Sequence, residues 1–328
     1  MPYCKTKWSM FTDIKVGYSC NNRCVHCVVE PSRRDRERDA KRLDSSTEEV
    51  LAFIDEAKSR GSRSIVLTGG EVTIRKDFSQ LVAHACGLGL EIAVQTNGRR
   101  LEALAQTGGL NGMRAAFTVA VHGPDAVIHD SITREPGSFD ETIRGIRALR
   151  RHPTLVVTGK LVISKRNQQK LRATLEMLAE LGLRHFNIAF PHAERFAPEE
   201  FSAVVPRYRE LRDELDRCAQ FLSSAGCSGE FETIPYCVTP SSPEVWKRSA
   251  DAILIADGRE NPGFIRAAGD DRLHDWEAER KQIKHKGARC AQCLFDKACE
   301  GPWTEYVETY GDDELQPLCD PAIIPMLE

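Results

Sequence analysis

Three cysteines near the start of the sequence have the spacing of a metal-binding loop. Cys20, Cys24 and Cys27 stand in the segment SCNNRCVHCVVE, directly after an apolar run. Three thiolates on a short loop can bind three irons of a cubane cluster and leave the fourth iron open to an external ligand. Zinc would require a fourth protein ligand, and His26, directly beside Cys27, is badly placed to supply it. The spacing favours an iron–sulfur cluster, with zinc or inert thiols as alternatives.

A second group of cysteines lies in the last third of the sequence. Cys290, Cys293 and Cys299 give C-x2-C-x5-C within RCAQCLFDKACEGPW, with Cys237 upstream and Cys319 downstream. A C-x2-C pair brings two thiolates to one metal from a tight turn, and a third thiolate five residues on adds to that signal. This spacing predicts a second metal site, with zinc again as an alternative to a cluster.

The elements that must position these cysteines alternate regularly between about residues 12 and 192. Segments such as Thr47–Arg60 and Asn167–Leu181 space their apolar residues three and four apart, as helices that cover a sheet require. This alternation predicts βα units around a parallel sheet. Six β-rich runs predict the strands, which are Asp13–Ser19, Ser64–Thr68, Glu91–Thr96, Ala115–Val121, Leu155–Ile163 and His185–Phe190.

The predicted organisation has four parts. Residues 1–11 form an N-terminal extension, 12–192 the βα core, 193–226 a helical connector and 227–328 a small loop-rich domain. This last part is poor in periodicity but rich in Cys, Pro and Gly, so it is expected to need a metal or cluster as a staple. The charged run SRRDRERDAKR, residues 32–42, is expected to be a solvated loop or lid.

The overall composition excludes several partner classes. With 45 Lys and Arg against 48 Asp and Glu, the net charge of -3 gives no electrostatic reason to expect nucleic acid or an anionic membrane. No apolar run approaches the roughly 18 to 20 residues that span a bilayer, and the start lacks the apolar region of a signal peptide. We therefore predict a cytoplasmic protein, whose twelve cysteines include metal ligands rather than disulfides.

The cysteine motif, its place after the first strand and the six βα units resemble the radical S-adenosylmethionine (SAM) superfamily, over roughly Phe11–His192. The resemblance implies an α/β fold, a partial (βα)6 TIM-like barrel. It implies that Cys20, Cys24 and Cys27 hold a [4Fe-4S] cluster whose open iron chelates SAM. An electron from the cluster would split the sulfonium into methionine and a 5'-deoxyadenosyl radical, with flavodoxin or ferredoxin as the electron donor.

The resemblance also implies residues that bind SAM. Gly69, Gly70 and Glu71 follow the second strand and resemble the family's GGE motif, although Val72 stands where the family usually has Pro. An ammonium has three donors and no acceptor, so a carboxylate and carbonyls suit the SAM amino group. Asn97, in QTNG after the third strand, resembles a turn common in the family.

Further SAM contacts follow from position on the barrel. Family members commonly carry a hydroxyl near Ala120 to bind the ribose, and Thr118 and His122 on the same face are the candidates to replace it. Arg134 lies in HDSITREPGSF, which resembles a segment of SPASM and twitch enzymes whose arginine approaches the SAM carboxylate; an exposed loop arginine is the alternative. Asn187, on the sixth strand, lies where the backbone usually contacts adenine.

The C-terminal cysteines resemble part of a SPASM domain. Its fuller pattern adds a cysteine four positions after the third and binds two auxiliary [4Fe-4S] clusters, but here Trp303 occupies that position. One auxiliary cluster is therefore expected. Its fourth ligand is expected to be Cys237, which resembles the upstream ligand of SPASM and twitch domains, with Cys319 as the competitor because it matches the final SPASM cysteine. The other ligands would be Cys290, Cys293 and Cys299.

The expected reaction is hydrogen abstraction from a small molecule such as a sugar, a nucleoside or a natural-product intermediate. Cys20 lies so near the start that no room is left for a preceding peptide-recognition domain, which favours a small molecule over the alternative, a ribosomally made peptide. Oxidation, epimerisation and C–C or C–S bond formation stay open as reaction types. A zinc- or thiol-binding protein without catalytic activity is the alternative of another class.

Overall fold

The computed structural model describes residues 11–192, 195–239, 263–270, 273–297 and 299–320. These residues group into two compact units. The first lies within Met1–Val121, Asp125–Lys160 and Asn261–Glu279, and the second within His122–Pro124, Leu161–Glu260 and Arg280–Glu328. The N-terminal extension expected over residues 1–11 lies, apart from Phe11, outside the described residues, and the domain boundaries proposed from the sequence stay predictions.

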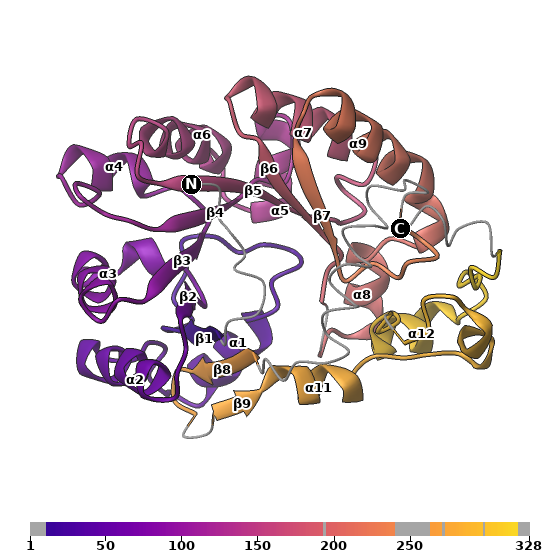
Figure 1. The fold of residues 1–328 in the computed structure, drawn as a ribbon, viewed down its shortest axis with the longest axis horizontal. Helices are drawn as coiled ribbons and strands as arrows, with labels where there is room; N and C mark the ends of the chain where they lie inside the picture. The colour runs from indigo at the N-terminus through magenta and orange to yellow at the C-terminus, as the bar shows by residue number, and fades with distance from the viewer. Residues whose placement is uncertain (1–10, 193–194, 240–262, 271–272, 298, 321–328) are drawn as a thin grey trace. The chain divides into compact units, whose positions relative to one another are not determined.

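The first unit is built on a parallel sheet (Figure 1). Across it the strands run in the order β5-β4-β3-β2-β1-β8-β9, and only β9 is antiparallel to its neighbour. Helices α2, α3, α4 and α6 lie along one face of these strands. The strands are β1 (Phe11–Lys15), β2 (Ser64–Thr68), β3 (Glu91–Thr96), β4 (Ala116–Ala120), β5 (Val156–Val162), β8 (Gly263–Ala267) and β9 (Leu273–Asp275). The helices are α1 (Glu30–Arg38), α2 (Thr47–Ser59), α3 (Phe78–Gly87), α4 (Leu101–Gln106), α5 (Ala126–Thr133) and α6 (Ser138–Leu149), with a short helix η1 (Val72–Ile74).

Alternating side chains decide which face of each strand is buried. In β2, Ile65 and Leu67 are fully buried, and in β4 the same holds for Phe117 and Val119. The intervening residues, such as Thr118, are only half-buried. Because successive side chains of a strand point to opposite faces, the apolar residues pack under the helices and the other face is left for polar and small side chains.

The second unit pairs β6 (His185–Ala189) in parallel with β7 (Ser228–Glu232). An aromatic cluster holds helix α12 (Thr304–Tyr310) against the end of β6. The rings of Tyr208 and Tyr306 lie 4.1 Å apart and Phe190 packs against both, while the Tyr306 hydroxyl donates to Glu314 Oε2 at 2.8 Å. The helices of this unit are α7 (Leu171–Glu180), α8 (Pro198–Val204), η2 (Tyr208–Glu210), α9 (Arg212–Ser224), η3 (Ala288–Gln292) and α12 (Thr304–Tyr310), and α11 (Trp276–Gln282) enters it from the first unit. None of the helices among the described residues is long and apolar enough to cross a membrane.

The predicted alternation of strands and helices is confirmed, and five of the six predicted strands agree with the structure within two residues. The first strand differs, because β1 ends at Lys15 rather than Ser19. Beyond this point the amides of Tyr18 and Ser19 both donate to Asp44 Oδ1 at 3.0 Å. The Asp44 side chain and an antiparallel backbone bridge between Gly17 and Asp44 therefore fix the path of the chain into the cysteine loop.

The prediction that the charged run over residues 32–42 is a solvated loop or lid is wrong for most of the run. Helix α1 covers Glu30–Arg38. Glu30 accepts hydrogen bonds from Arg33 and Arg34 at 2.8 and 3.0 Å, and pairs at these spacings stabilise a helix. Pro31 stands in the first turn, where a proline is tolerated. The helix has no fully buried residue, so no apolar stripe indicated it in the sequence.

Replacing Gly145 by Ala is expected to destabilise the protein by about 1–3 kcal/mol, although Ala is the better helix former. Gly145 lies in α6, and an added Cβ would stand 2.1 Å from the carbonyl oxygen of Gly98. Gly87→Ala in α3 is the matched control, because its Cβ would meet nothing within 4 Å; it should stabilise by about 0.4–1 kcal/mol. Chemical denaturation measures both, and equal effects would contradict this packing.

Candidate metal and cofactor site

The N-terminal cysteines lie on the loop that joins β1 to α1, and each is half-buried. Burial raises the pKa of Cys20 to about 11 and also raises the pKa of Cys24 and of Cys27. Neighbouring thiols add to the increase, since the Cys24 thiolate would be repelled by those of Cys27 and Cys20. Such a group of thiols loses its protons to a bound cation, so the donor set fits an iron–sulfur cluster.

The glycines of the TGGE segment are required by a close backbone contact. The amides of Gly70 and Glu71 donate to the carbonyls of Gly17 and Ser19, both at 2.8 Å. A Cβ on Gly69 or Gly70 would stand 2.3 or 2.1 Å from those carbonyl oxygens. The end of β2 is thereby held against the residues that lead into Cys20.

Glu71 connects the ends of β2 and β3. Its side chain is buried, and Oε1 accepts from Thr73 and from the Thr96 hydroxyl at 2.6 Å. Oε2 accepts from the amide of Asn97, also at 2.6 Å. Oε2 accepts this one hydrogen bond from the described residues, whereas a carboxylate oxygen has two lone pairs, so Oε2 keeps capacity for a further donor such as an ammonium.

Asn97 links this carboxylate to the cysteine loop. Its Nδ2 donates to Asn21 Oδ1 at 2.7 Å and lies 3.9 Å from Cys20 Sγ. The structure therefore brings Cys20, Glu71 and Asn97 together, as the sequence predicted for a single site.

The other predicted SAM contacts are spread more widely. Thr118 lies on the half-buried face of β4, and Arg134 caps α5 with its side chain exposed. His122 falls in the second unit, where its Nδ1 accepts from the amide of Val162 at 3.4 Å. Asn187 Oδ1 is a buried acceptor with no hydrogen-bond partner among the described residues.

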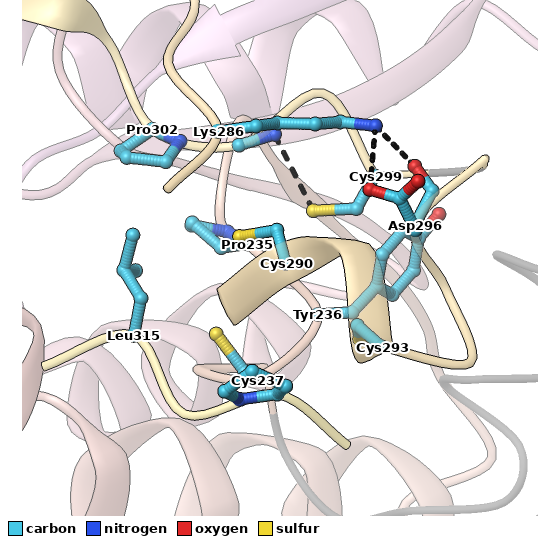
Figure 2. A pocket seen from close by; sticks show the side chains of 12 residues that line it. Pro235, Tyr236, Cys237, Lys286, Cys290, Cys293, Asp296, Cys299, Pro302 and Leu315 are labelled. Carbon is cyan, nitrogen blue, oxygen red and sulfur yellow. Dashed lines mark hydrogen bonds and ion pairs between the residues drawn. The ribbon is translucent and has the colours of Figure 1, made fainter. Parts of the chain in front are cut away.

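Four of the C-terminal cysteines line one cavity in the second unit (Figure 2). Burial raises the pKa of Cys237 to about 11, and the neighbouring Cys299 and Cys293 contribute to the increase. Cys319 does not line this cavity, and its thiol lies 3.3 Å from the carbonyl oxygen of Gln292. The lining cysteines are Cys237, Cys290, Cys293 and Cys299.

Two contacts fix the segment around Cys237, and the first of them joins it to the cysteine turn. The rings of Tyr236 and Phe295 stack 4.9 Å apart, and Arg212 donates to the carbonyl of Cys237 at 2.6 Å. Four thiols around one cavity fit a cluster or another thiophilic metal centre.

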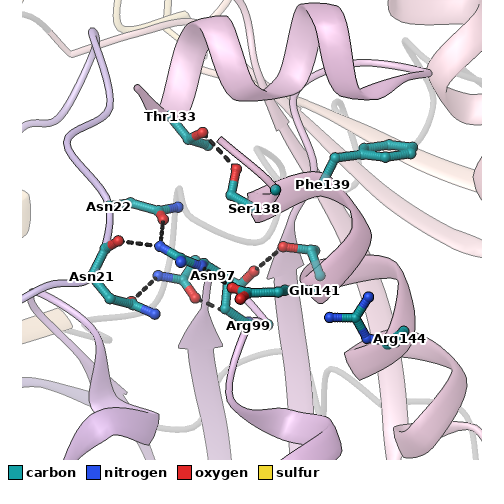
Figure 3. Close-up of polar contacts among 12 residues, drawn as sticks. Asn21, Asn22, Asn97, Arg99, Thr133, Ser138, Phe139, Glu141 and Arg144 are labelled. Atoms are coloured by element: carbon teal, nitrogen blue, oxygen red, sulfur yellow. Dashed lines mark hydrogen bonds and ion pairs between the residues drawn. The ribbon is translucent and has the colours of Figure 1, made fainter. Parts of the chain in front are cut away.

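Arg99 is a site residue that the sequence did not indicate (Figure 3). Its guanidinium donates to the carbonyl of Asn21, to Asn22 Oδ1 at 2.8 Å and to Glu141 Oε2 at 2.5 Å. On the other side of the loop, the amide of Arg23 donates to the carbonyl of Thr133 at 2.9 Å. Arginine directly after the QTNG turn was the available signal, but only the fold shows that it reaches the cysteine loop.

Arg99→Gln is expected to lower the thermal midpoint and the iron content together, because loss of the guanidinium leaves two loop oxygens without a donor, at a cost of about 1–3 kcal/mol. Arg144→Gln is the matched control. Arg144 pairs with Glu102 at 2.9 Å, but its side chain is 48% exposed against 13% for Arg99, and an exposed pair contributes about 0–1 kcal/mol. Thermal melts and iron analysis measure both variants. If both variants lose equal iron and equal thermal stability, Arg99 does not hold the cysteine loop.

Comparison with known proteins agrees with this geometry. The model of the radical SAM superfamily matches residues 14–178, half of the chain. The AdoMet-dependent heme synthase of Methanosarcina barkeri is 28% identical over 208 residues, which are 60% of this chain and 56% of that protein. The mycofactocin maturase MftC of Mycobacterium tuberculosis is 30% identical over 171 residues, 52% of this chain and 41% of the maturase. The chain thus matches about half the length of these relatives.

Solved structures show the same fold at low identity. SuiB of Streptococcus suis bound to SAM has a TM-score of 0.63 at 13% identity, covering 96% of this chain and 77% of SuiB. The anSMEcpe structure with bound AdoMet also has a TM-score of 0.63, at 12% identity, covering 97% and 95%. The fold is that of radical SAM enzymes with a partial barrel, whose members use SAM and a [4Fe-4S] cluster. This chain belongs to the radical SAM superfamily.

Proposed function

We propose that this radical SAM enzyme abstracts a hydrogen atom from a small organic molecule, with SAM bound at the loop of Cys20, Cys24 and Cys27. The observation that carries the proposal is the connection of Glu71 through Asn97 to Cys20. It sets a buried carboxylate with spare acceptor capacity beside the cysteine loop, which suits the SAM ammonium.

When bound, the cluster and SAM would supply a one-electron cleavage of the sulfonium. The residues of the chain bind the cluster and SAM and orient them. The three thiolates would hold three irons. Glu71 Oε2 would accept from the SAM ammonium, while its bonds to Thr96 and Asn97 fix the carboxylate in place. Thr118, His122, Arg134 and Asn187 stay proposed contacts of SAM on the strength of the resemblance.

The C-terminal cysteines are proposed to hold one auxiliary [4Fe-4S] cluster that orients substrate or passes an electron. Support comes from the single cavity lined by Cys237, Cys290, Cys293 and Cys299. We infer that flavodoxin or ferredoxin delivers the electron and that the enzyme acts in the cytoplasm. The zinc-binding alternative is not favoured, because the chain belongs to an enzyme superfamily that binds iron–sulfur clusters.

A ribosomally made peptide is the second candidate substrate. It is favoured by the likeness to the mycofactocin maturase and to SuiB, which was solved with a precursor peptide. The likeness to a heme synthase favours a small molecule.

Stimulation of SAM cleavage distinguishes the two candidates. The enzyme, prepared without oxygen and reduced with dithionite, is given SAM and a metabolite extract split by ultrafiltration at about 1 kDa, which passes metabolites and retains longer peptides. We expect the small fraction to raise 5'-deoxyadenosine formation. Stimulation by the retained fraction alone, lost after protease treatment, would establish the peptide reading instead.

A further inference from the structure

A lysine amine lies against an indole in the second unit. Lys284 and Trp303 face each other across an antiparallel bridge, which hydrogen bonds from His285 to Pro302 and from Thr304 to Ile283 hold at 2.9 and 3.0 Å. Lys284 Nζ stands 3.4 Å from the centroid of the Trp303 ring. The packing of the bridge therefore presents both side chains on one face.

Both side chains carry buried donors that have no acceptor among the residues that the structure describes. Lys284 Nζ and Trp303 Nε1 are buried and make no hydrogen bond to any of the described residues. The ring face attracts a cation, but it offers no lone pair to the ammonium protons. Burial lowers the pKa of Lys284 to about 7, because the charges of Glu300 and Glu232 offset the loss of water only in part. What this pair lacks is an acceptor that carries negative charge.

The pair lies where a substrate of this fold would be expected. The His192 ring stacks on Trp303 at 3.9 Å, and His192 follows the carboxyl end of β6 by three residues. Functional groups of βα folds gather at the carboxyl ends of strands. Trp303 is also only four residues after Cys299, which lines the cysteine cavity.

We propose that Lys284 and Trp303 form a subsite that binds a carboxylate of the substrate, one oxygen accepting from the lysine ammonium and the other from the indole N–H. This inference rests on the proposed function for the presence of a substrate. One cation matches one negative charge, whereas a dianionic phosphate would keep a charge unneutralised in a buried place. Arg280, a cation whose charge acts on Lys284, is already paired with Glu300.

Binding of simple carboxylates tests the subsite. The protein with its clusters, without SAM or reductant, is titrated with propionate and with propionamide, which has the same shape but no charge. We expect propionate to bind in the millimolar range and Lys284→Met to weaken it by about tenfold or more, by calorimetry. Lys297→Met, at an exposed lysine of the same unit, is the matched control and should keep the affinity.

The outcomes separate the proposal from the function on which it rests. Equal binding of propionamide, or unchanged affinity in Lys284→Met, overturns the subsite even if SAM cleavage is active. Absence of SAM cleavage overturns the proposed function and leaves the binding result as it is. A six-residue peptide with a free or an amidated C-terminus is the second arm. If the peptide with a free C-terminus binds in a Lys284-dependent way and propionate does not bind, the carboxylate belongs to a peptide substrate. If neither propionate nor this peptide binds, the subsite is overturned.

The stability of Lys284→Met gives an independent measurement. If the amine is there to bind a ligand, it destabilises the ligand-free protein as a buried donor without an acceptor. Its removal should then raise the thermal midpoint in the absence of ligand by about 2–4 °C. If the amine serves the fold through its contact with Trp303, the midpoint should fall, and that result would overturn the proposal.

Discussion

Cys24→Ala should reduce the formation of 5'-deoxyadenosine to the background and lower the iron content by about four atoms per chain. Cys24 is the middle residue of the motif and has both other thiols as electrostatic neighbours. Two remaining thiolates cannot hold three irons of a cubane, so the cluster should be lost altogether rather than weakened. Anaerobic reconstitution, iron and sulfide analysis and chromatography of the reaction products measure the effect.

Cys86→Ala is the control for this experiment, because Cys86 is exposed in α3 and lies outside both cysteine groups. It should keep the full iron content and the full rate. A Cys24→Ala protein that still cleaves SAM, or that loses no iron, would show that the motif does not hold the radical-generating cluster.

Strands β2, β3, β4 and β5 could be predicted because each is short and carries several apolar and β-branched residues. The ends of β2 and β3 fall at the predicted residues. Asn97 directly follows β3, and Glu71 follows β2 after two glycines. Such a pattern is local, since a strand and the group at its carboxyl end are adjacent in sequence. The cysteine motif is local in the same sense.

What the sequence did not indicate depends on contacts between distant residues or on charge alone. Arg99 reaches Asn21 and Asn22 over more than seventy residues, and no spacing rule reports that. Helix α1 rests on charged pairs with no buried stripe. In the sequence Lys284 looks like an ordinary charged residue, and only the structure shows its bridge to Trp303 and its buried amine.

Cys237→Ala should remove the auxiliary cluster, with a loss of about four irons per chain, whereas Cys319→Ala should keep it. Both cysteines stand outside the C-x2-C-x5-C run, and the sequence motif alone left them as competitors. Cys237 lines the cavity with the other thiols, and its pKa is raised by burial and by Cys299. Cys319 is exposed and lies against the carbonyl of Gln292.

The two variants are matched controls for each other, because each removes one thiol next to the same turn. The N-terminal cluster should survive in both, so the iron that remains in Cys237→Ala should still support SAM cleavage. Equal iron loss would mean that both thiolates are ligands, as in a site with more than one cluster. Loss confined to Cys319→Ala would reverse the assignment. The segment that holds Cys319 would then have to turn its thiol into the cavity when iron binds, although the neighbouring Leu318 carbonyl accepts from the Leu294 amide at 2.9 Å.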